Sequence, residues 1–441
     1  MFRHHVVTIT NSSGLPAFTA AVVTTATFSK TFIPFYRIGS TPIFVIACLL
    51  GLALVAASWR EISNNCKFVR EFMLIAAMLY ALGTANYFAF SFGQVPFTHL
   101  IGILAFHGLF MLFGFAAARS LTTVFVVLLV QGAIYSIIIA HYTIVSGDLM
   151  RNGFLRDVFG IGEVPLVYAL HQNIGTALSL TLLAALALGS RRIRLLTLVA
   201  IPFCLAFLFH IAARTAIAAL LGSLLFLLWA SLWGRSRKLA LLTLAIVAAS
   251  LAVASISFYD FAVQDRNVDA IAPDAFSRTI RELQSDDPRF RVQIWTRAWR
   301  RIGSEDPGRL LLGRGVGSYS IDEGFGPPTW LIDKSPKVYP HNTYLDLLYE
   351  TGIMGLLLFG TLTILPLLIS LNHWSKFCQR ERAAISVYVV YLAMIQLSGG
   401  FAYDYPFQFF LAMAIGAIGL KRMEPTENLA KPQLSNSEAS A

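Results

Sequence analysis

The stretch 340–355 holds the highest density of residues that could take part in chemistry. His341 follows a proline, and Asp346 and Glu350 stand four residues apart, so that on a helix they would share one face. Free imidazole, with a pKa of about 6.5, can accept a proton at neutral pH. A histidine beside the start of a helix can also be purely structural. Both roles, general base and structural spacer, are compatible with this position.

Two arginines are candidates for binding an anion. Arg214 stands in an otherwise apolar segment, and Arg291 begins the motif Arg-Val-Gln-Ile-Trp. A guanidinium group can donate paired hydrogen bonds to two phosphate oxygens, whereas lysine offers only a point charge. The two side chains could therefore clamp a diphosphate. Alternatively, Arg214 could reach lipid headgroups from the membrane edge, and the arginines at 289–301 could form a solvated basic face against anionic lipid.

Other polar positions carry weaker signals. The turn Gly313-Arg-Gly-Val-Gly317 could wrap phosphate oxygens, and Asn173 in His-Gln-Asn could line a substrate cavity. Asp404 could pair with a neighbouring arginine, and Gly352 and Gly355 would let another helix approach closely. The long segment 259–343 contains no acidic and histidine cluster with metal-ligand spacing. We therefore expect neither a metal nor a cofactor.

The elements that position these residues are predicted to be membrane helices. Hydrophobic residues make up 56% of the chain and charged residues only 13%, against about 25% charged in an ordinary soluble domain. Blocks of about 20 apolar residues match the thickness of a bilayer core. The pattern predicts an all-α polytopic membrane protein with about 12 transmembrane helices. These lie near 15–36, 41–58, 69–90, 98–117, 121–141, 166–189, 193–210, 212–233, 239–258, 344–371, 384–401 and 403–420. The first is the least apolar, because it is rich in threonine and contains Lys30.

The distribution of basic residues predicts the topology. Alternate short loops carry clusters such as Arg191/Arg192/Arg194 and Arg235/Arg237/Lys238, while the opposite short loops near 91–97 and 401–404 carry none. This asymmetry places both termini in the cytoplasm and the large loop outside. It also accounts for the net charge of +10, so we expect membrane lipids and not nucleic acid as partners. The expected organisation is transmembrane helices 1–9 over 1–258, a large periplasmic loop with short amphipathic helices over 259–343, helices 10–12 over 344–420, and a disordered cytoplasmic tail over 421–441.

Within the large loop, one amphipathic helix is predicted over 288–302. Asp287 and Pro288 would cap its start and Gly303 would end it. Val292, Trp295, Trp299 and Ile302 would share its apolar face, with arginines around the others. Such a helix is expected to lie on the bundle or on the membrane surface.

The motif His341-Asn342-x2-Leu345-x4-Glu350-x-Gly352-x2-Gly355 resembles that of the bacterial O-antigen ligase and polymerase superfamily. Arg291 with Trp295, the glycine turn at 313–317 and Arg214-Thr215-Ala216 support the resemblance, which covers roughly 165–365 by motif. One departure is Ala213, where many relatives have serine.

The resemblance implies metal-independent, inverting transfer of a glycan from a polyprenyl diphosphate at the periplasmic face of the bacterial inner membrane. His341 resembles the general base of this family, and Arg214 and Arg291 resemble its diphosphate-binding arginines. Asn342, Glu350 and Asn173 are weaker candidates for substrate binding. We expect an O-antigen ligase that uses an undecaprenyl diphosphate-linked glycan and a hydroxyl of the lipid A core.

Three alternatives remain. A polymerase of the same superfamily would use another lipid-linked glycan as acceptor, and a protein O-glycosyltransferase would use a polypeptide. A transporter for lipid-linked sugars would show paired halves with interrupted helices, which this sequence lacks.

Overall fold

The computed structural model describes residues 14–32, 40–66, 69–146, 167–210, 213–264, 279–280, 291–328, 339–398, 400 and 404–423, and every structural statement below concerns these residues. The proposed cap at Asp287 and Pro288 and nearly all of the proposed tail lie outside them.

The described chain is built from helices. The long ones are α1 (Gly14–Phe32), α2 (Ser40–Ala57), α4 (Arg70–Asn86), α5 (Phe97–Ala118), α6 (Leu121–Ser146), α8 (Val167–Leu188), α9 (Arg191–His210), α10 (Arg214–Trp233), α11 (Arg237–Gln264), α16 (Thr343–Asn372), α17 (Gln379–Ser398) and α18 (Tyr405–Met423). The short ones are α3 (Trp59–Cys66), the π-helical turn η2 (Tyr87–Ser91), α13 (Arg291–Gly303), α14 (Pro307–Leu312), α15 (Ser318–Asp322) and η3 (Trp374–Lys376).

Each predicted span overlaps one long helix, so the prediction of an all-helical fold is confirmed. Five of the described helices are long and apolar enough to cross a membrane: Arg70–Ser91, Phe97–Ala118, Arg191–Phe209, Arg214–Trp233 and Thr343–Asn372. That every predicted segment crosses the bilayer stays a prediction.

The threonine-rich first helix lies in the centre of the bundle. Val23 and Phe28 of α1 are fully buried, and the Phe28 ring packs against Phe409 and Phe410 of α18. The hydroxyl of Thr27 is satisfied within the helix, since it donates to the carbonyl of Val23 at 2.7 Å. Threonine can therefore occupy a dry interior, and low hydropathy here reflects burial against protein instead of lipid.

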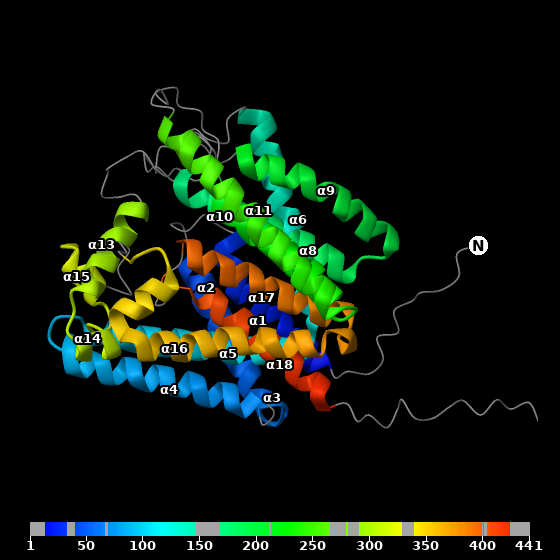
Figure 1. Ribbon diagram of the computed structural model, residues 1–441. Helices are drawn as coiled ribbons and strands as arrows, with labels where there is room; N and C mark the ends of the chain where they lie inside the picture. Colours follow the sequence, from blue (N-terminus) through cyan, green and yellow to red (C-terminus); the bar gives the residue numbers. More distant parts are fainter. Residues whose placement is uncertain are drawn as a thin grey trace, which may run out of the picture.

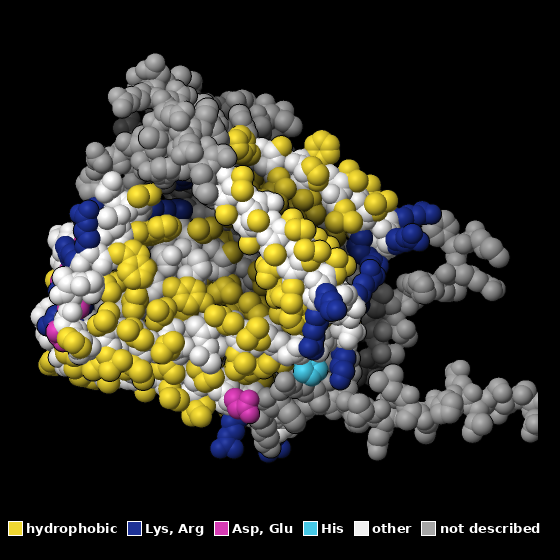
Figure 2. All heavy atoms as spheres, in the orientation of Figure 1, with side chains coloured by type: hydrophobic (Ala, Val, Ile, Leu, Met, Phe, Trp, Pro, Cys, Tyr) yellow, Lys and Arg dark blue, Asp and Glu magenta, His cyan; other side chains and the backbone are white. Residues whose placement is uncertain are grey.

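The outside of the bundle is apolar. Figure 2 shows a broad hydrophobic surface across the helices, with dark blue basic side chains gathered toward the two ends. Side chains such as Leu196, Phe203 and Leu357 are more than half exposed. Since soluble monomers rarely expose apolar patches beyond a few hundred Å², this surface fits contact with lipid.

The polar elements of the large loop gather at one end of the bundle. Figure 1 shows α13, α14 and α15 beside the first residues of α16, with the α8–α9, α10–α11 and α16–α17 turns at the opposite end. Those three turns carry the basic clusters on which the predicted topology rests.

Helix α16 is interrupted at Gly352, whose φ of +67° and ψ of −167° are not helical. The break separates a first half-helix, 343–351, from a longer second part. A Cβ atom on Gly352 would lie 2.3 Å from the carbonyl oxygen of Leu311. The expectation of close helix approach is confirmed at Gly352, whose neighbour is Leu311 of the short helix α14. It was wrong at Gly355, where a Cβ would meet Thr351 of its own helix.

Candidate functional site

His341 occupies an unusual backbone conformation just before α16. Its φ of +55° is the single positive value among the described non-glycine residues. Such a conformation costs of order 1–3 kcal/mol and persists only where neighbouring structure imposes it. Here Asn342 provides one constraint, because it caps α16 by accepting the N–H of Leu345 at 2.9 Å. This hydrogen bond gives Asn342 a structural role.

Helix α13 supplies a second constraint on the same segment. The indole Nε1 of Trp295 donates to the carbonyl of Pro340 at 2.7 Å, directly before His341. The Tyr339 ring packs against the imidazole with its centroid 4.6 Å away. The side chain of Thr343 donates to the carbonyl of Ile395 in α17 at 3.1 Å. Contacts from two other helices thus fix the backbone that carries the imidazole.

Several charged groups surround Tyr339. Burial is the largest cause that raises the pKa of its phenol; nearby Asp404 and Asp346 add to this, and Arg291 opposes it. The phenol therefore stays neutral near pH 7 and can donate a hydrogen bond. Asp404 also accepts the N–H of Gly400 at 2.9 Å, and a Cβ on Gly400 would meet the Tyr339 ring. The ring of Tyr339 packs on His341, so the charged groups near Tyr339 also lie in the vicinity of the histidine: Arg291, Asp346 and Asp404.

Glu350 is engaged with the glycine turn. Its side-chain carboxyl group lies close to the backbone N–H groups of Gly317 and Tyr319. Its carbonyl accepts the N–H of Gly315 at 2.9 Å, and the carbonyl of Tyr349 accepts the N–H of Arg314 at 3.0 Å. The break in α16 frees these carbonyls from helical partners, and the glycine turn supplies replacements. These contacts favour a structural role for Glu350 and the turn over the predicted substrate and phosphate contacts.

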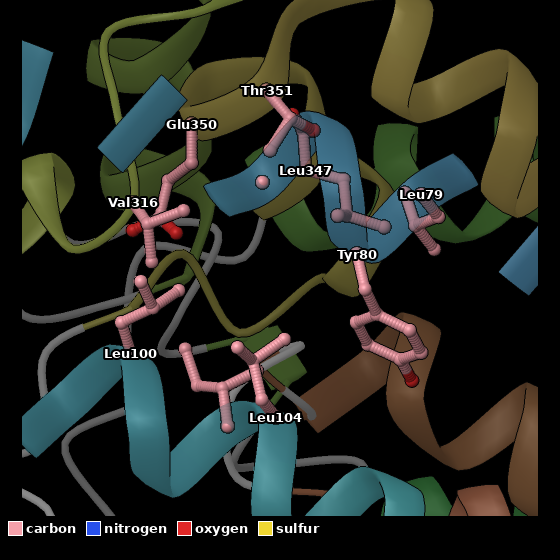
Figure 3. Close-up of a pocket in the computed structure, with 10 residues that line it drawn as sticks. Leu79, Tyr80, Leu100, Leu104, Val316, Leu347, Glu350 and Thr351 are labelled. Atoms are coloured by element: carbon pink, nitrogen blue, oxygen red, sulfur yellow. The ribbon is translucent and has the colours of Figure 1, made fainter. Parts of the chain in front are cut away.

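The glycine turn also lines a small recess beside the break in α16, through Val316. Figure 3 shows Leu79 and Tyr80 of α4, Leu100 and Leu104 of α5, and Leu347 of α16 lining it, with Glu350 and Val316 at one side. Its walls are mostly apolar, with Tyr80, Glu350 and Thr351 as the exceptions. Together with the hydrogen bonds to the turn, this shows that Glu350 lies between protein elements.

An ion-pair network ties α13, α15 and the segments that flank α14 to α16. Glu323, almost fully buried, pairs with Arg297 at 2.9 Å and Arg301 at 3.1 Å. Arg314 pairs with Asp322 at 3.1 Å and with Glu305, and Tyr349 of α16 donates to Asp322 at 2.6 Å. The prediction that most of these arginines face lipid was wrong for Arg297 and Arg301, since acidic residues of the loop itself neutralise them.

The apolar face of α13 also differs from the predicted one. Ala298 and Ile302 are buried against Tyr319, Leu345 and Tyr349, with Ile294 and Trp295 partly buried beside them. Val292 and Trp299 are exposed, Trp299 by 56%. The helix turns Ile294 and Ala298 inward because its contact is with α16 and α15, and the spacing of large apolar residues alone could not identify that partner.

Arg214 is the first residue of α10, and its Nη1 donates to the hydroxyl of Thr279 at 3.0 Å. Thr279 belongs to the large loop, so Arg214 faces the same loop that carries Arg291. Their convergence on one anion remains a proposal. Asn173 lies in the first turns of α8, whose side chains are described only from Ile174 onward.

Sequence reasoning missed Tyr339. Its position two residues before the motif histidine does not by itself indicate that its ring packs on the imidazole. It also missed Glu323, whose importance depends on its burial. In the described part of the chain, no group of three or more His, Cys, Asp or Glu side chains is arranged to hold a metal ion.

Residues 199–360 match the family model described as O-antigen ligase. The matched segment contains Arg214, Arg291 and His341, and it confirms the resemblance noted from the sequence. No curated protein matches the chain.

Proposed function

We propose that this member of the O-antigen ligase superfamily transfers a glycan from undecaprenyl diphosphate to a hydroxyl of the lipid A core, outside the inner membrane. The observation that carries the proposal is the constrained His341, held beside Tyr339 within electrostatic reach of Arg291 and inside the matched segment. A strained residue held by several neighbours is typical of functional sites.

In the proposed reaction, the acceptor hydroxyl attacks the anomeric carbon of the donor sugar. His341 accepts the hydroxyl proton as the new carbon–oxygen bond forms, which is the role of a general base. The bond between the anomeric carbon and the diphosphate oxygen breaks, and undecaprenyl diphosphate leaves with the electron pair. Attack from the side opposite the leaving group inverts the anomeric configuration.

The arginines are proposed to stabilise the negative charge that develops on the leaving diphosphate. Fixed positive groups aimed at developing charge are usually the largest single contribution to catalysis. Arg291 begins α13, the helix whose Trp295 holds the histidine segment, so one element positions both the base and the cation. Arg214 would approach from α10, where its contact with Thr279 orients it toward the loop.

The decisive experiment is transfer by the purified protein in nanodiscs. The donor is undecaprenyl diphosphate carrying a polysaccharide, offered with either lipid A–core or a second lipid-linked glycan. A ligase joins the polymer to lipid A–core, whereas a polymerase extends the lipid-linked glycan. Transfer to neither acceptor by a folded protein, shown to bind its donor, would contradict the proposed function.

A further inference from the structure

The short helix α14 exposes three consecutive leucines. Leu310, Leu311 and Leu312 are all at least a third exposed, Leu311 by 47%, and none of the residues of α14 is buried. Short loop helices in water normally turn such side chains inward, because exposing them is unfavourable. Three consecutive exposed leucines, in a loop where Val292, Trp299 and Phe325 are also exposed, indicate an apolar surrounding.

The leucines continue the apolar outer surface of two candidate membrane spans. The carbonyl of Leu311 lies against Gly352 of α16, and the side chain of Asn86 in α4 donates to the carbonyl of Leu312. On α16 the residues just past the break, Ile353, Met354 and Leu357, are exposed, as are Phe88 and Phe92 at the end of the α4 span. In Figure 2 the hydrophobic surface over α4 and α16 extends to the end of the bundle where α14 lies.

The position of the break gives the depth of α14. From Ile353 to Asn372 the second part of α16 has 20 residues. At 1.5 Å per residue it is about 30 Å long, the thickness of the hydrocarbon core of a bilayer. Gly352 then lies at the boundary between hydrocarbon and headgroups, and α14, which touches it, lies at the same level.

The flanking residues are those of a membrane interface. Asp306 caps α14 by accepting the N–H groups of Gly308 and Arg309, so its first turn carries charged groups while its last turn carries the leucines. On the neighbouring α13, Trp299 and Arg300 are both exposed. Tryptophan and basic residues are enriched where apolar surface meets lipid headgroups.

We propose that α14 inserts its three leucines into the bilayer leaflet on the side of α13–α15, as a membrane anchor of the loop. The anchor fixes the depth of the glycine turn relative to the membrane surface, because this turn directly follows α14. Through the turn it also fixes the depth of the half-helix that begins at 343. A second copy of the chain could also cover these leucines. Lipid is favoured because the leucines continue the faces of α4 and α16, which would contact lipid in any case.

The test uses full-length protein in nanodiscs of phosphatidylethanolamine and phosphatidylglycerol. Cys48, Cys66, Cys204 and Cys378 are replaced by serine, and Leu310→Cys, Leu311→Cys and Leu312→Cys each receive a nitroxide label. Collision rates with oxygen, which partitions into lipid, and with a water-soluble nickel chelate are then measured. The matched control is Ser304→Cys, in an exposed polar turn two residues before Asp306.

We expect labels at 310–312 to collide preferentially with oxygen and the label at 304 to collide preferentially with the nickel chelate. The ratio of the two rates should differ at least about threefold between position 311 and the control. Nickel accessibility at 310–312 equal to that at 304 would overturn the proposal. So would protection from both reagents together with spin–spin broadening, because that outcome places a second copy on α14. Only variants that elute as monodisperse protein are measured. Because three positions are labelled, the test still stands if one variant fails to fold.

Discussion

At the scale of single residues, the proposed chemistry centres on a histidine whose backbone geometry is imposed by its neighbours. Asn342 fixes the start of α16, Trp295 holds the carbonyl of Pro340, and the Tyr339 ring packs on the imidazole. The high pKa of the Tyr339 phenol keeps it neutral at physiological pH, so it is unsuited to accept the proton. We propose His341 as the proton acceptor, with the neutral Tyr339 as a packing partner.

Replacing His341 with alanine should reduce transfer by about 10²-fold or more, the usual cost of losing a general base. Thermal stability and donor-lipid binding should change little, since alanine leaves the cap at Asn342 intact. The measurement is in vitro turnover beside a donor-binding assay. The matched variant Tyr339→Phe keeps the ring packing and should retain far more activity. Turnover above roughly a tenth of wild type in His341→Ala would exclude the base role.

Replacing Arg214 or Arg291 with lysine tests how the leaving diphosphate is stabilised. Lysine keeps the charge but loses the fork that matches two phosphate oxygens, so we expect a loss of at least about tenfold in turnover for each variant. Arg300→Lys, at an exposed position of α13, serves as the control and should be nearly neutral.

The same assay with excess EDTA should leave the wild-type enzyme active if the arginines perform the stabilisation. Inactivation by EDTA that magnesium reverses, together with active lysine variants, would contradict this account.

At the scale of elements, helix positions could be predicted from the sequence but the break in α16 could not. Apolar periodicity identifies α16 because its length and composition are local properties. The interruption depends on Leu311 and the glycine turn, which are distant in sequence and fill the space at Gly352. Likewise, the sequence predicts the arginines of α13 on a helix. It does not predict that Arg297 and Arg301 pair with Glu323, because that pairing depends on the position of α15 beside α13.

Gly352→Ala should damage both stability and transfer. The added Cβ would lie 2.3 Å from the Leu311 carbonyl at a φ of +67°, so we expect a cost of about 1–3 kcal/mol. Displacement of the half-helix that begins beside His341 should lower turnover by at least about tenfold. Gly360→Ala is the matched control, because a Cβ there meets nothing within 4 Å and alanine favours helix. Equal melting temperatures and activities for the two variants would show that the break is not required.

At the scale of the whole molecule, the alternation of basic loops and the arrangement of helices agree. The turns rich in arginine and lysine lie at one end of the bundle, and α13–α15 lie at the other (Figure 1). The sequence could predict this separation because each short turn reverses the chain. It could not predict that the first helix would be central, since burial of α1 depends on packing with α18 and α5.

The remaining prediction concerns which end faces the periplasm. The positive-inside rule assigns the arginine-rich turns to the cytoplasm, because lysine and arginine bias loops toward that side. An alkaline phosphatase reporter fused near residue 330 should therefore be active, since the enzyme matures only in the periplasm, while fusions near 236 and 376 should be inactive. A green fluorescent protein reporter, which fluoresces in the cytoplasm, should give the opposite pattern at the same three positions. His341 lies close in sequence to the fusion at 330 and far from the other two. Phosphatase activity at 236 and 376 with none at 330 would place the histidine in the cytoplasm, where this transfer to the lipid A core could not occur as proposed.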